Sequence, residues 1–560
     1  MKHRALLAVP CVGLLATLFA CGSSSNSSSP STAVSAQDAL ATATPIKHLV
    51  VIYNENVSFD HYFATYPTAT NPSGEPAFTS AAGTPTPNGL SGSLLTSNPN
   101  FTNAANAPGQ ANPFRLDRTQ AATSDQNHAY TPEQQAYNNG AMDLFPKYTG
   151  SGTAGGAGAF GTTGQVMGYF DGNTVTALWN YAQHFAMSDN AWTAAYGPST
   201  PGALEVVSGQ TNGMQIVKTT AQPSTLAKSS YYIEDGAGGL TEIGDADPGY
   251  DMCSSTTDQI MINAKNVGDL LNAKSVTWGG FMGGFNLQTV NSNGTTGCKR
   301  STIATAVNAA TADYVPHHNW FQYFQSTSNP QHTRPSSMAA IGSSLESDGK
   351  TPEPANHQYD TDDFFAAVQA GNYPSVSFLK APAAQDAHAG YSDPLDEQLF
   401  VTKVVNFLMQ QPDWKNTAVV VTYDDSDGWY DHQFVTPVTS SMNAVDQLNG
   451  NGVCGTGTPP TGVSGSPVNG RCGPGTRIPF LVISPWAKPN YVDHTLINQA
   501  SVTRFIEDNW LGSARLGGGS FDATAGDMRA LFNFNSTGLN PVLYIDPNQG
   551  TQVATPPSST

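Results

Sequence analysis

Three largely apolar runs stand out in the pattern of this chain, at residues 49–52 (LVVI), 417–423 (TAVVVTY) and 477–483 (RIPFLVI). They are rich in β-branched residues and show little alternation of polar and apolar positions. Runs of this kind are typical of strands that are buried on both faces of a parallel sheet. A fourth strand is expected at residues 374–379, directly before Lys380. The pattern therefore predicts a core built around a parallel sheet.

The stretches between these runs carry helical signals. Residues 174–187 repeat apolar side chains three and four positions apart and predict a helix. Another helix is expected to begin at Pro201, because proline suits the first turn of a helix, and residues 267–281 predict a helix followed by a strand. A further helix is expected to start after His128, with Thr131 as its cap. Strands that alternate with helices indicate the α/β class.

Two long regions, residues 68–114 and 433–476, are rich in Gly, Pro, Asn, Ser and Thr and have no clear period. Long structureless loops are uncommon in compact domains, so we expect the first region to be an ordered insertion over the entrance of a site. No clear linker follows Pro45, and candidate site residues recur from Glu55 to His494. We therefore expect one catalytic domain over residues 46–545, followed by a flexible tail at residues 546–560.

The first 45 residues have the composition of an export signal and a tether. Lys2 and Arg4 precede an apolar segment, residues 5–20, which contains a proline and is too short to span a bilayer comfortably. Cys21 follows directly, as in a bacterial lipoprotein cleavage site, although Phe19 is atypical there and plain secretion is the alternative. Residues 22–45 are rich in Ser, Ala and Thr and predict a flexible tether. We expect a periplasmic or cell-envelope lipoprotein, or a secreted protein.

Net charge and cysteine content limit the expected binding partners and predict disulfides. The formal net charge of −19 argues against nucleic-acid binding and against electrostatic docking on anionic lipid, so we expect membrane contact only through a lipid on Cys21. Four cysteines lie beyond residue 21, and an even number in an exported protein predicts disulfides. Three pairings are possible. We expect the two that close the shorter loops, Cys253–Cys298 and Cys454–Cys472.

Candidate chemistry lies at the ends of the predicted strands, where ligands bind in open α/β sheets. Glu55 and Asn56 follow the first strand, and their oxygens suit a hard divalent cation, although helix-capping residues at a strand exit would look the same. Asp424 and Asp425 follow the strand at residues 417–423. Adjacent carboxylates at a buried strand end repel each other, so a cation, a shared proton or strong N–H donors must offset the repulsion. We expect a buried pair of carboxylates here rather than a solvated acidic turn, because the preceding strand has the pattern of a fully buried one.

The stretch from Glu55 to Phe63, ENVSFDHYF, resembles the E-N-x-S-F-D-H-Y-F signature of the bacterial phosphoesterase family of acid phosphatases and C-type phospholipases. That family belongs to the alkaline-phosphatase-like superfamily. Similar segments occur in the expected order up to about residue 510. The resemblance implies a three-layer α/β/α sandwich with a largely parallel central sheet, helices on both faces and long loop insertions.

The resemblance also implies roles for residues that are ambiguous by themselves. Ser199 lies near an expected helix start, where free N–H groups favour an anion, but an ordinary cap explains it equally well. Its match to the family segment G-P-[ST]-x-P makes it the nucleophile, with Thr200 as the alternative. Similarity to the family makes four histidines candidate phosphoryl contacts, with one of them as the proton donor: His128, His317, His318 and His388. His494 is carried over as a metal candidate, although a capping role fits it as well.

The activity implied by the resemblance is phosphoester hydrolysis through a phosphoserine. One divalent ion, Mg²⁺, Ca²⁺, Mn²⁺ or Zn²⁺, would be held by Glu55, Asn56, Ser199, Asp424 and Asp425, with Asn56 also contacting the substrate. Residues 197–203 and 380–394 are similar to the acid-phosphatase branch, so we expect phosphate monoesters as substrates. Because protonated histidines would bind phosphate best and supply a proton to the leaving group, we also expect a rate that peaks on the acid side of neutral. The alternatives are a phospholipase C acting on lipid diesters and an inactive surface-binding lipoprotein.

Overall fold

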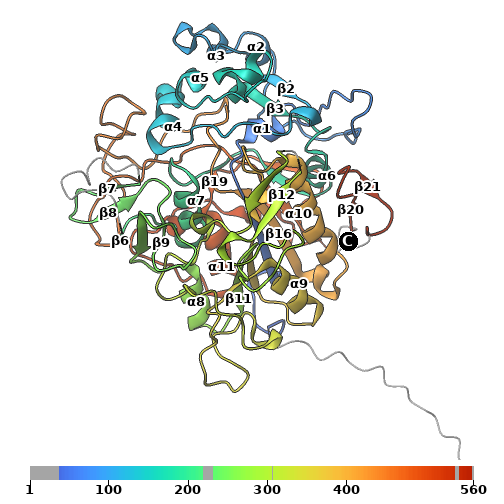
Figure 1. The fold of residues 1–560 in the computed structure, drawn as a ribbon, viewed down its shortest axis with the longest axis vertical. Helices are drawn as coiled ribbons and strands as arrows, with labels where there is room; N and C mark the ends of the chain where they lie inside the picture. Colours follow the sequence, from blue (N-terminus) through green and yellow to red (C-terminus); the bar gives the residue numbers. More distant parts are fainter. Residues whose placement is uncertain (1–36, 219–230, 306, 537–541, 558–560) are drawn as a thin grey trace, which may run out of the picture.

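The computed structural model describes residues 37–218, 231–305, 307–536 and 542–557 (Figure 1). Within them, the largest sheet has eight strands. Its order across the sheet is β14 (Gln358–Tyr359), β11 (Trp278–Met282), β15 (Val376–Lys380), β1 (His48–Asn54), β16 (Thr417–Tyr423), β17 (Phe480–Ile483), β4 (Ala186–Ser188) and β18 (Tyr491–Asp493). All five predicted strands are present in it, including the one expected at the end of residues 267–281.

The sheet is largely parallel, as predicted. Strand β1 runs parallel to β15 on one side and to β16 on the other, whereas β17 is antiparallel to both of its neighbours. The register pairs Ile52 with Leu379 and Asn54 with Tyr423. The carboxyl ends of β15, β1 and β16 therefore meet at one edge of the sheet, and the residues that follow these strands lie together.

Helices cover both faces of the sheet, which gives the predicted three layers (Figure 1). One group packs together on one side: α7 (Ser199–Ser208), α8 (Val267–Ala273) and α11 (Ala500–Trp510). The other side carries α6 (Thr176–His184), α9 (Thr361–Gln369) and α10 (Pro394–Leu408). The main core lies between these layers and includes every residue of the buried run 49–52.

Three of the predicted helix boundaries were wrong. The helix expected over residues 174–187 ends at His184, because the chain enters strand β4 at Ala186. Helix α7 begins at Ser199, two residues before the proline that was expected to start it. The helix after His128 is capped by the backbone of Ala129, and its range, Tyr130–Tyr137, already contains Thr131.

A cap of short elements covers the carboxyl edge of the sheet, at the top of Figure 1. It contains α2 (Ser93–Thr96), α3 (Pro99–Thr102), α4 (Tyr130–Tyr137), α5 (Phe145–Tyr148) and the parallel pair β2 (Phe114–Leu116) and β3 (Gly168–Phe170). A second apolar cluster joins this cap to Trp429 and Tyr430, in the loop that follows β16. Residues 68–114 are thus part of an ordered layer.

The remaining strands form small sheets around this body. They are β6 (Met214–Lys218), β10 (Gln259–Ile262) and β9 (Asp247–Pro248) in one sheet, and the pairs β7 (Tyr232–Glu234) with β8 (Leu240–Glu242), β12 (Ser301–Ala304) with β13 (Ala309–Ala312), and β5 (Ala191–Trp192) with β19 (Ile497–Asn498). Strands β20 (Tyr544–Ile545) and β21 (Gln552–Val553) pair near the C-terminus. Because Asn180 of α6 donates to the carbonyl of Gly550 at 2.9 Å, this part of the predicted flexible tail is held against the domain.

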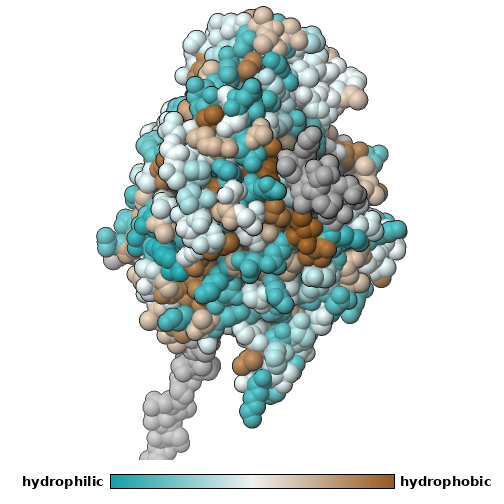
Figure 2. Space-filling view, turned by 90° about the vertical axis from the view of Figure 1, so that its left-hand side faces the viewer, coloured by the Kyte–Doolittle hydropathy of each residue, from teal (hydrophilic) through white to brown (hydrophobic). Residues whose placement is uncertain are grey.

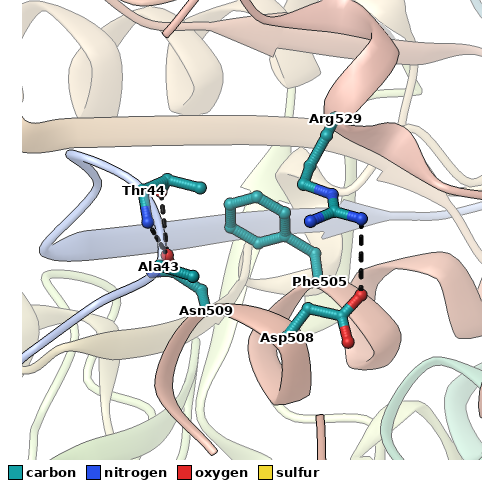
Figure 3. A pocket seen from close by; sticks show the side chains of 6 residues that line it. All are labelled: Ala43, Thr44, Phe505, Asp508, Asn509 and Arg529. Atoms are coloured by element: carbon teal, nitrogen blue, oxygen red, sulfur yellow. Dashed lines mark hydrogen bonds and ion pairs between the residues drawn. The ribbon is translucent and has the colours of Figure 1, made fainter. Parts of the chain in front are cut away.

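The segment before β1 is anchored to helix α11 (Figure 3). The backbone N–H and the hydroxyl of Thr44 both donate to Asn509 Oδ1, at 2.9 and 2.8 Å, and Asn509 Nδ2 donates to the carbonyl of Ile46 at 3.0 Å. The chain therefore enters its central strand from a fixed point. The predicted export signal, Cys21 and most of the predicted tether lie outside the described residues.

Both predicted disulfides are present, Cys253–Cys298 and Cys454–Cys472. The face drawn in Figure 2 carries scattered apolar patches among polar side chains. None of the helices in the described part of the chain has the length and apolar character needed to cross a bilayer.

Candidate active site

Four acidic side chains meet at the carboxyl edge of the sheet, and we call Glu55, Asp386, Asp424 and Asp425 the acidic cluster. Glu55 follows β1 and Asp424 follows β16, so the strand register places them side by side. The backbone N–H of Glu55 donates to the carbonyl of Asp386 at 2.8 Å. All four are at most 1% exposed. Burial raises the pKa of Asp424 and Asp425, and the neighbouring carboxylates raise both further.

Ser199 presents its hydroxyl to this cluster from the first residue of α7. Its Oγ lies 2.8 Å from Glu55 Oε2 and 3.2 Å from Asp425 Oδ2. The hydroxyl of Thr200 points elsewhere, 3.3 Å from the carbonyl of His317 and 3.2 Å from Tyr323 Oη. Of the two candidate nucleophiles, Ser199 is therefore the one that faces the acidic cluster.

Helix α7 can approach the cluster closely because residue 202 is glycine. A Cβ atom at Gly202 would lie 2.2 Å from the carbonyl oxygen of Asp424, well inside van der Waals contact. The carbonyl of Gly202 accepts a hydrogen bond from Tyr53 Oη at 2.8 Å. Close packing at this position sets the depth at which Ser199 enters the site.

Lys380, the last residue of β15, adds a positive charge to the acidic cluster. Its ammonium group contacts Glu55 Oε1 and lies 3.5 Å from Asp424 Oδ2, and its side chain is 1% exposed. Burial alone would lower the pKa of Lys380, but Glu55 and Asp424 outweigh burial and raise it. Burial likewise works to raise the pKa of Glu55, but Lys380 outweighs it and lowers that pKa. One lysine cannot balance four carboxylates.

Replacing Lys380 with methionine should lower the free energy of unfolding by about 3–5 kcal/mol, because it leaves buried Glu55 and Asp424 without their cation. Urea unfolding in the presence of a chelator measures this loss. Lys403→Met is the matched control, since Lys403 is exposed and lies over the ring of Phe365, and it should leave the stability nearly unchanged. Equal losses in the two variants would mean that Lys380 does not balance the cluster.

Three of the four predicted histidines line the same edge. His318 Nδ1 lies 3.1 Å from Glu55 Oε1 and 3.6 Å from Asp386 Oδ2. The ring centroid of His388 is 6.1 Å from that of His318 and 6.0 Å from that of His128. His317 lies farther out, with its side chain 30% exposed and its Nδ1 3.5 Å from Asp247 Oδ1.

The four histidines differ in charge. Burial works against the protonated forms of His128 and His317, but neighbouring carboxylates outweigh it and raise both pKa values. Burial lowers the pKa of His388 to about 4, and burial together with nearby cationic groups lowers that of His318 well below its ordinary value. His318 and His388 are therefore neutral at neutral pH, whereas the surrounding carboxylates favour the protonated forms of His128 and His317. The expected acid optimum assumed that the histidines are protonated. Because two of the four have lowered pKa values, that expectation loses half of its support.

The oxygen donors at this edge fit a hard divalent cation. The predicted ligands lie together there, and Asn56 shows the clearest sign of a missing partner. Its Nδ2 donates to Asp427 Oδ1 at 3.0 Å, while its Oδ1 is buried and has no hydrogen-bond partner among the described residues. Glu55, His318 and Asp386 also bring one possible ligand atom each within 4.8 Å of one another.

A buried network of ion pairs supports the segments that follow β1 and β16. Arg477 Nε donates to Asp431 Oδ2 at 3.0 Å, and its Nη2 donates to Asp60 Oδ1 at 3.0 Å. His432 Nδ1 lies 2.6 Å from Asp60 Oδ2. Asp60 belongs to helix α1 (Phe59–Phe63), within the signature stretch, so the network fixes the segments that follow β1 and β16. Asp431 and His432 therefore hold these segments in place and do not belong to the acidic cluster.

His494 is not part of this arrangement. Its Nδ1 lies 2.8 Å from Asp189 Oδ1, and its side chain is 69% exposed. A surface role fits it better than the metal role carried over from the family resemblance, and it does not cap α11, whose N-cap residue is Gln499.

Sequence reasoning missed Lys380, Asp386 and Asp427. Lys380 ends an expected strand, so the rule that singled out Glu55 at a strand end could have found it. Asp386 lies six residues farther on and Asp427 two residues after Asp425, in loops whose shape the pattern does not specify. Only the fold reveals that these two carboxylates point back to the site.

Comparisons with known proteins give the family to which this chain is similar. A family model described as Phosphoesterase family matches residues 46–511. Non-hemolytic phospholipase C of Burkholderia pseudomallei is 24% identical over 90% of this chain and 61% of that protein, and phospholipase C A of Mycobacterium tuberculosis is 24% identical over 89% and 80%. A crystal structure of an alkaline-phosphatase-superfamily protein from Vibrio parahaemolyticus has a TM-score of 0.23, at 11% identity over 72% of each chain.

The phospholipase C relatives from Pseudomonas aeruginosa and Burkholderia pseudomallei are longer, and the chain spans 22% to 61% of their length. The family model, in contrast, covers most of the chain, including every residue of the acidic cluster, Ser199 and the four site histidines. The chain belongs to the Phosphoesterase family.

Proposed function

We propose that this protein is a metal-dependent hydrolase of phosphoric esters that uses Ser199 as its nucleophile and cleaves phosphodiesters in the manner of a phospholipase C. The observation that carries the proposal is the position of Ser199 Oγ, 2.8 Å from Glu55 Oε2 and 3.2 Å from Asp425 Oδ2 at the start of α7. A hydroxyl held between two carboxylates at a helix N-terminus is placed both to lose its proton and to receive a phosphoryl group. A surface-binding protein without activity has no use for this arrangement.

The divalent cation would be held by Glu55, Asn56, Ser199, Asp424 and Asp425. When bound, it would lower the pKa of the Ser199 hydroxyl and neutralise charge on the phosphoryl oxygens. Its oxygen-rich surroundings favour Mg²⁺, Ca²⁺ or Mn²⁺, while Zn²⁺ is allowed.

Ser199 Oγ would pass its proton to the carboxylate of Asp425 and attack the phosphorus atom as the bond to the leaving alcohol breaks. His128, which carries a proton at neutral pH, can give that proton to the leaving oxygen. Water then attacks the phosphorylated Ser199, which still carries the second alcohol of the diester, the phosphorus–Oγ bond breaks, and Asp425 returns the proton to Oγ. The neutral imidazole of His388, 6.0 Å from His128 between ring centroids, is placed to accept the proton of that water.

The names of the relatives favour diesters. Two proteins that align with about nine-tenths of this chain are named phospholipase C. Acid phosphatase is the second candidate, because residues 197–203 and 380–394 are similar to the acid-phosphatase branch. We also propose that the protein is exported, since two disulfides within the described residues fit an oxidising compartment. Anchoring through a lipid on Cys21 is part of that proposal.

A panel of substrates separates the two candidates. We expect kcat/KM for phosphatidylcholine, or for a choline phosphodiester, to exceed that for p-nitrophenyl phosphate by about tenfold or more, which is about 1.4 kcal/mol of differential transition-state binding. Rates should be measured from acid to alkaline pH with one divalent ion added. A preference for the monoester together with an acid optimum would favour the acid phosphatase. Hydrolysis of neither substrate, with metal present, would contradict both.

A further inference from the structure

Asp427 contacts two of the proposed site residues, Asn56 and His128. It is fully buried in the loop after β16, two positions beyond Asp425. Its Oδ1 accepts a hydrogen bond from Asn56 Nδ2 at 3.0 Å and lies 3.1 Å from His128 Nδ1. The backbone N–H of Gln126 points at the same carboxylate, 3.3 Å from each oxygen. One side chain thus joins the segment after β1, the segment after β16 and the cap.

The contact with Asn56 decides which end of its amide faces the acidic cluster. An amide has a donor end and an acceptor end, and a carboxylate can only accept. Because Nδ2 donates to Asp427, Oδ1 lies on the other side, where it is buried without a partner among the described residues. A reversed amide would set its oxygen against the Asp427 carboxylate, and the two would repel each other.

The contact with His128 fixes the imidazole in the same way. His128 Nδ1 lies near two acceptors, Asp427 Oδ1 at 3.1 Å and the carbonyl of Gln126 at 2.9 Å. Nδ1 must therefore carry a hydrogen, and Nε2 is the nitrogen left for a ligand. A carboxylate that holds one imidazole nitrogen sets both the orientation of the ring and the position of the other nitrogen.

We propose that Asp427 is a positioning residue that turns the amide oxygen of Asn56 toward a divalent cation and Nε2 of His128 toward the phosphoryl group. The inference rests on the proposed function and deepens it. Asp427 acts through its two partners, so its replacement should loosen metal binding even when no substrate is present.

Titration of the metal-free protein with Mn²⁺ by calorimetry, without substrate, tests this directly. Asp427→Asn should weaken Mn²⁺ affinity by about 10–100-fold, because the amide loses the negative charge and its NH2 group must face a donor, either the backbone N–H of Gln126 or the pair formed by Asn56 Nδ2 and His128 Nδ1. Asp125→Asn is the matched control. Asp125 lies 3.6 Å from the same His128 nitrogen, but its side chain is 53% exposed, and its replacement should leave Mn²⁺ affinity unchanged.

The double variant Asn56→Asp/Asp427→Asn should restore part of the Mn²⁺ affinity that Asp427→Asn loses. It exchanges acid and amide at the same net charge, so the donor now comes from position 427 and an oxygen at position 56 still faces the cluster. Its affinity should exceed that of Asp427→Asn by about tenfold or more, and near-ultraviolet circular dichroism checks that each variant is folded.

Unchanged affinity in Asp427→Asn, or a double variant no tighter than that single variant, would overturn the inference and leave the proposed function standing. A wild-type protein that binds no Mn²⁺ would overturn the inference together with the metal dependence of the proposed function. If Asp427→Asn does not fold, the double variant decides: a folded double variant that binds Mn²⁺ about tenfold more weakly than wild type would overturn the inference, and near-wild-type affinity supports it.

Discussion

Replacing Ser199 with alanine should lower the turnover of every phosphoester substrate by about 10⁴-fold or more, because it removes the hydroxyl that faces Glu55 and Asp425. The other four cation ligands and the histidines would remain, so substrate should still bind and KM should change little. Initial rates with and without added divalent ion, on purified wild type and variant, give the comparison.

Two controls separate loss of the nucleophile from loss of structure. Ser208→Ala makes the same change at the other end of α7, where Oγ donates to the carbonyl of Lys265 at 3.0 Å, and it should keep full activity. Thr200→Val removes the neighbouring hydroxyl, which contacts Tyr323 rather than the acidic cluster, and it should keep most of the activity. An active Ser199→Ala with an inactive Thr200→Val would move the nucleophile to Thr200.

Removal of the divalent ion should have the second large effect. A chelator should abolish turnover, and Glu55→Gln and Asp424→Asn should each lower both metal affinity and turnover by about 100-fold or more, since each removes one charged oxygen without changing side-chain size. Elemental analysis after gel filtration, alongside initial rates, measures the two effects together.

The cap offers a matched control for the metal variants. Asp446 is also fully buried, but it accepts a hydrogen bond from Tyr130 Oη at 2.8 Å in the cap rather than facing the acidic cluster. Asp446→Asn should leave the metal content unchanged. Unchanged metal content in Glu55→Gln and Asp424→Asn as well would remove both residues from the cation site.

Much of this fold could be predicted from its apolar runs, because strands buried on both faces need continuous β-branched sequence. The runs at residues 49–52 and 417–423 became adjacent parallel strands, and the residues directly after them, Glu55 and Asp424, became neighbours. Both disulfides followed from loop length alone. Properties that depend on short stretches of sequence were accessible in this way.

The features that could not be predicted from the sequence depend on contacts between distant segments. Lys380 shares the cluster with Glu55 across 325 positions of sequence, and Asp427 meets His128 across 299. The helix over residues 174–187 stops at His184 because the next residues are needed as strand β4 beside β17 and β18. The pKa values of His128 and His317 are raised and those of His318 and His388 are lowered, according to burial and the charges around each ring, which residue spacing cannot show.

The central claim is that Ser199 becomes phosphorylated during turnover. The most direct test is to mix the metal-loaded protein with substrate, quench it in acid within one turnover, digest it and locate the retained phosphoryl group by tandem mass spectrometry. We predict that the group lies on Ser199 in the wild type and is absent from Ser199→Ala. A phosphoryl group on Thr200 or on a histidine, or rapid turnover with none on the protein, would contradict the account.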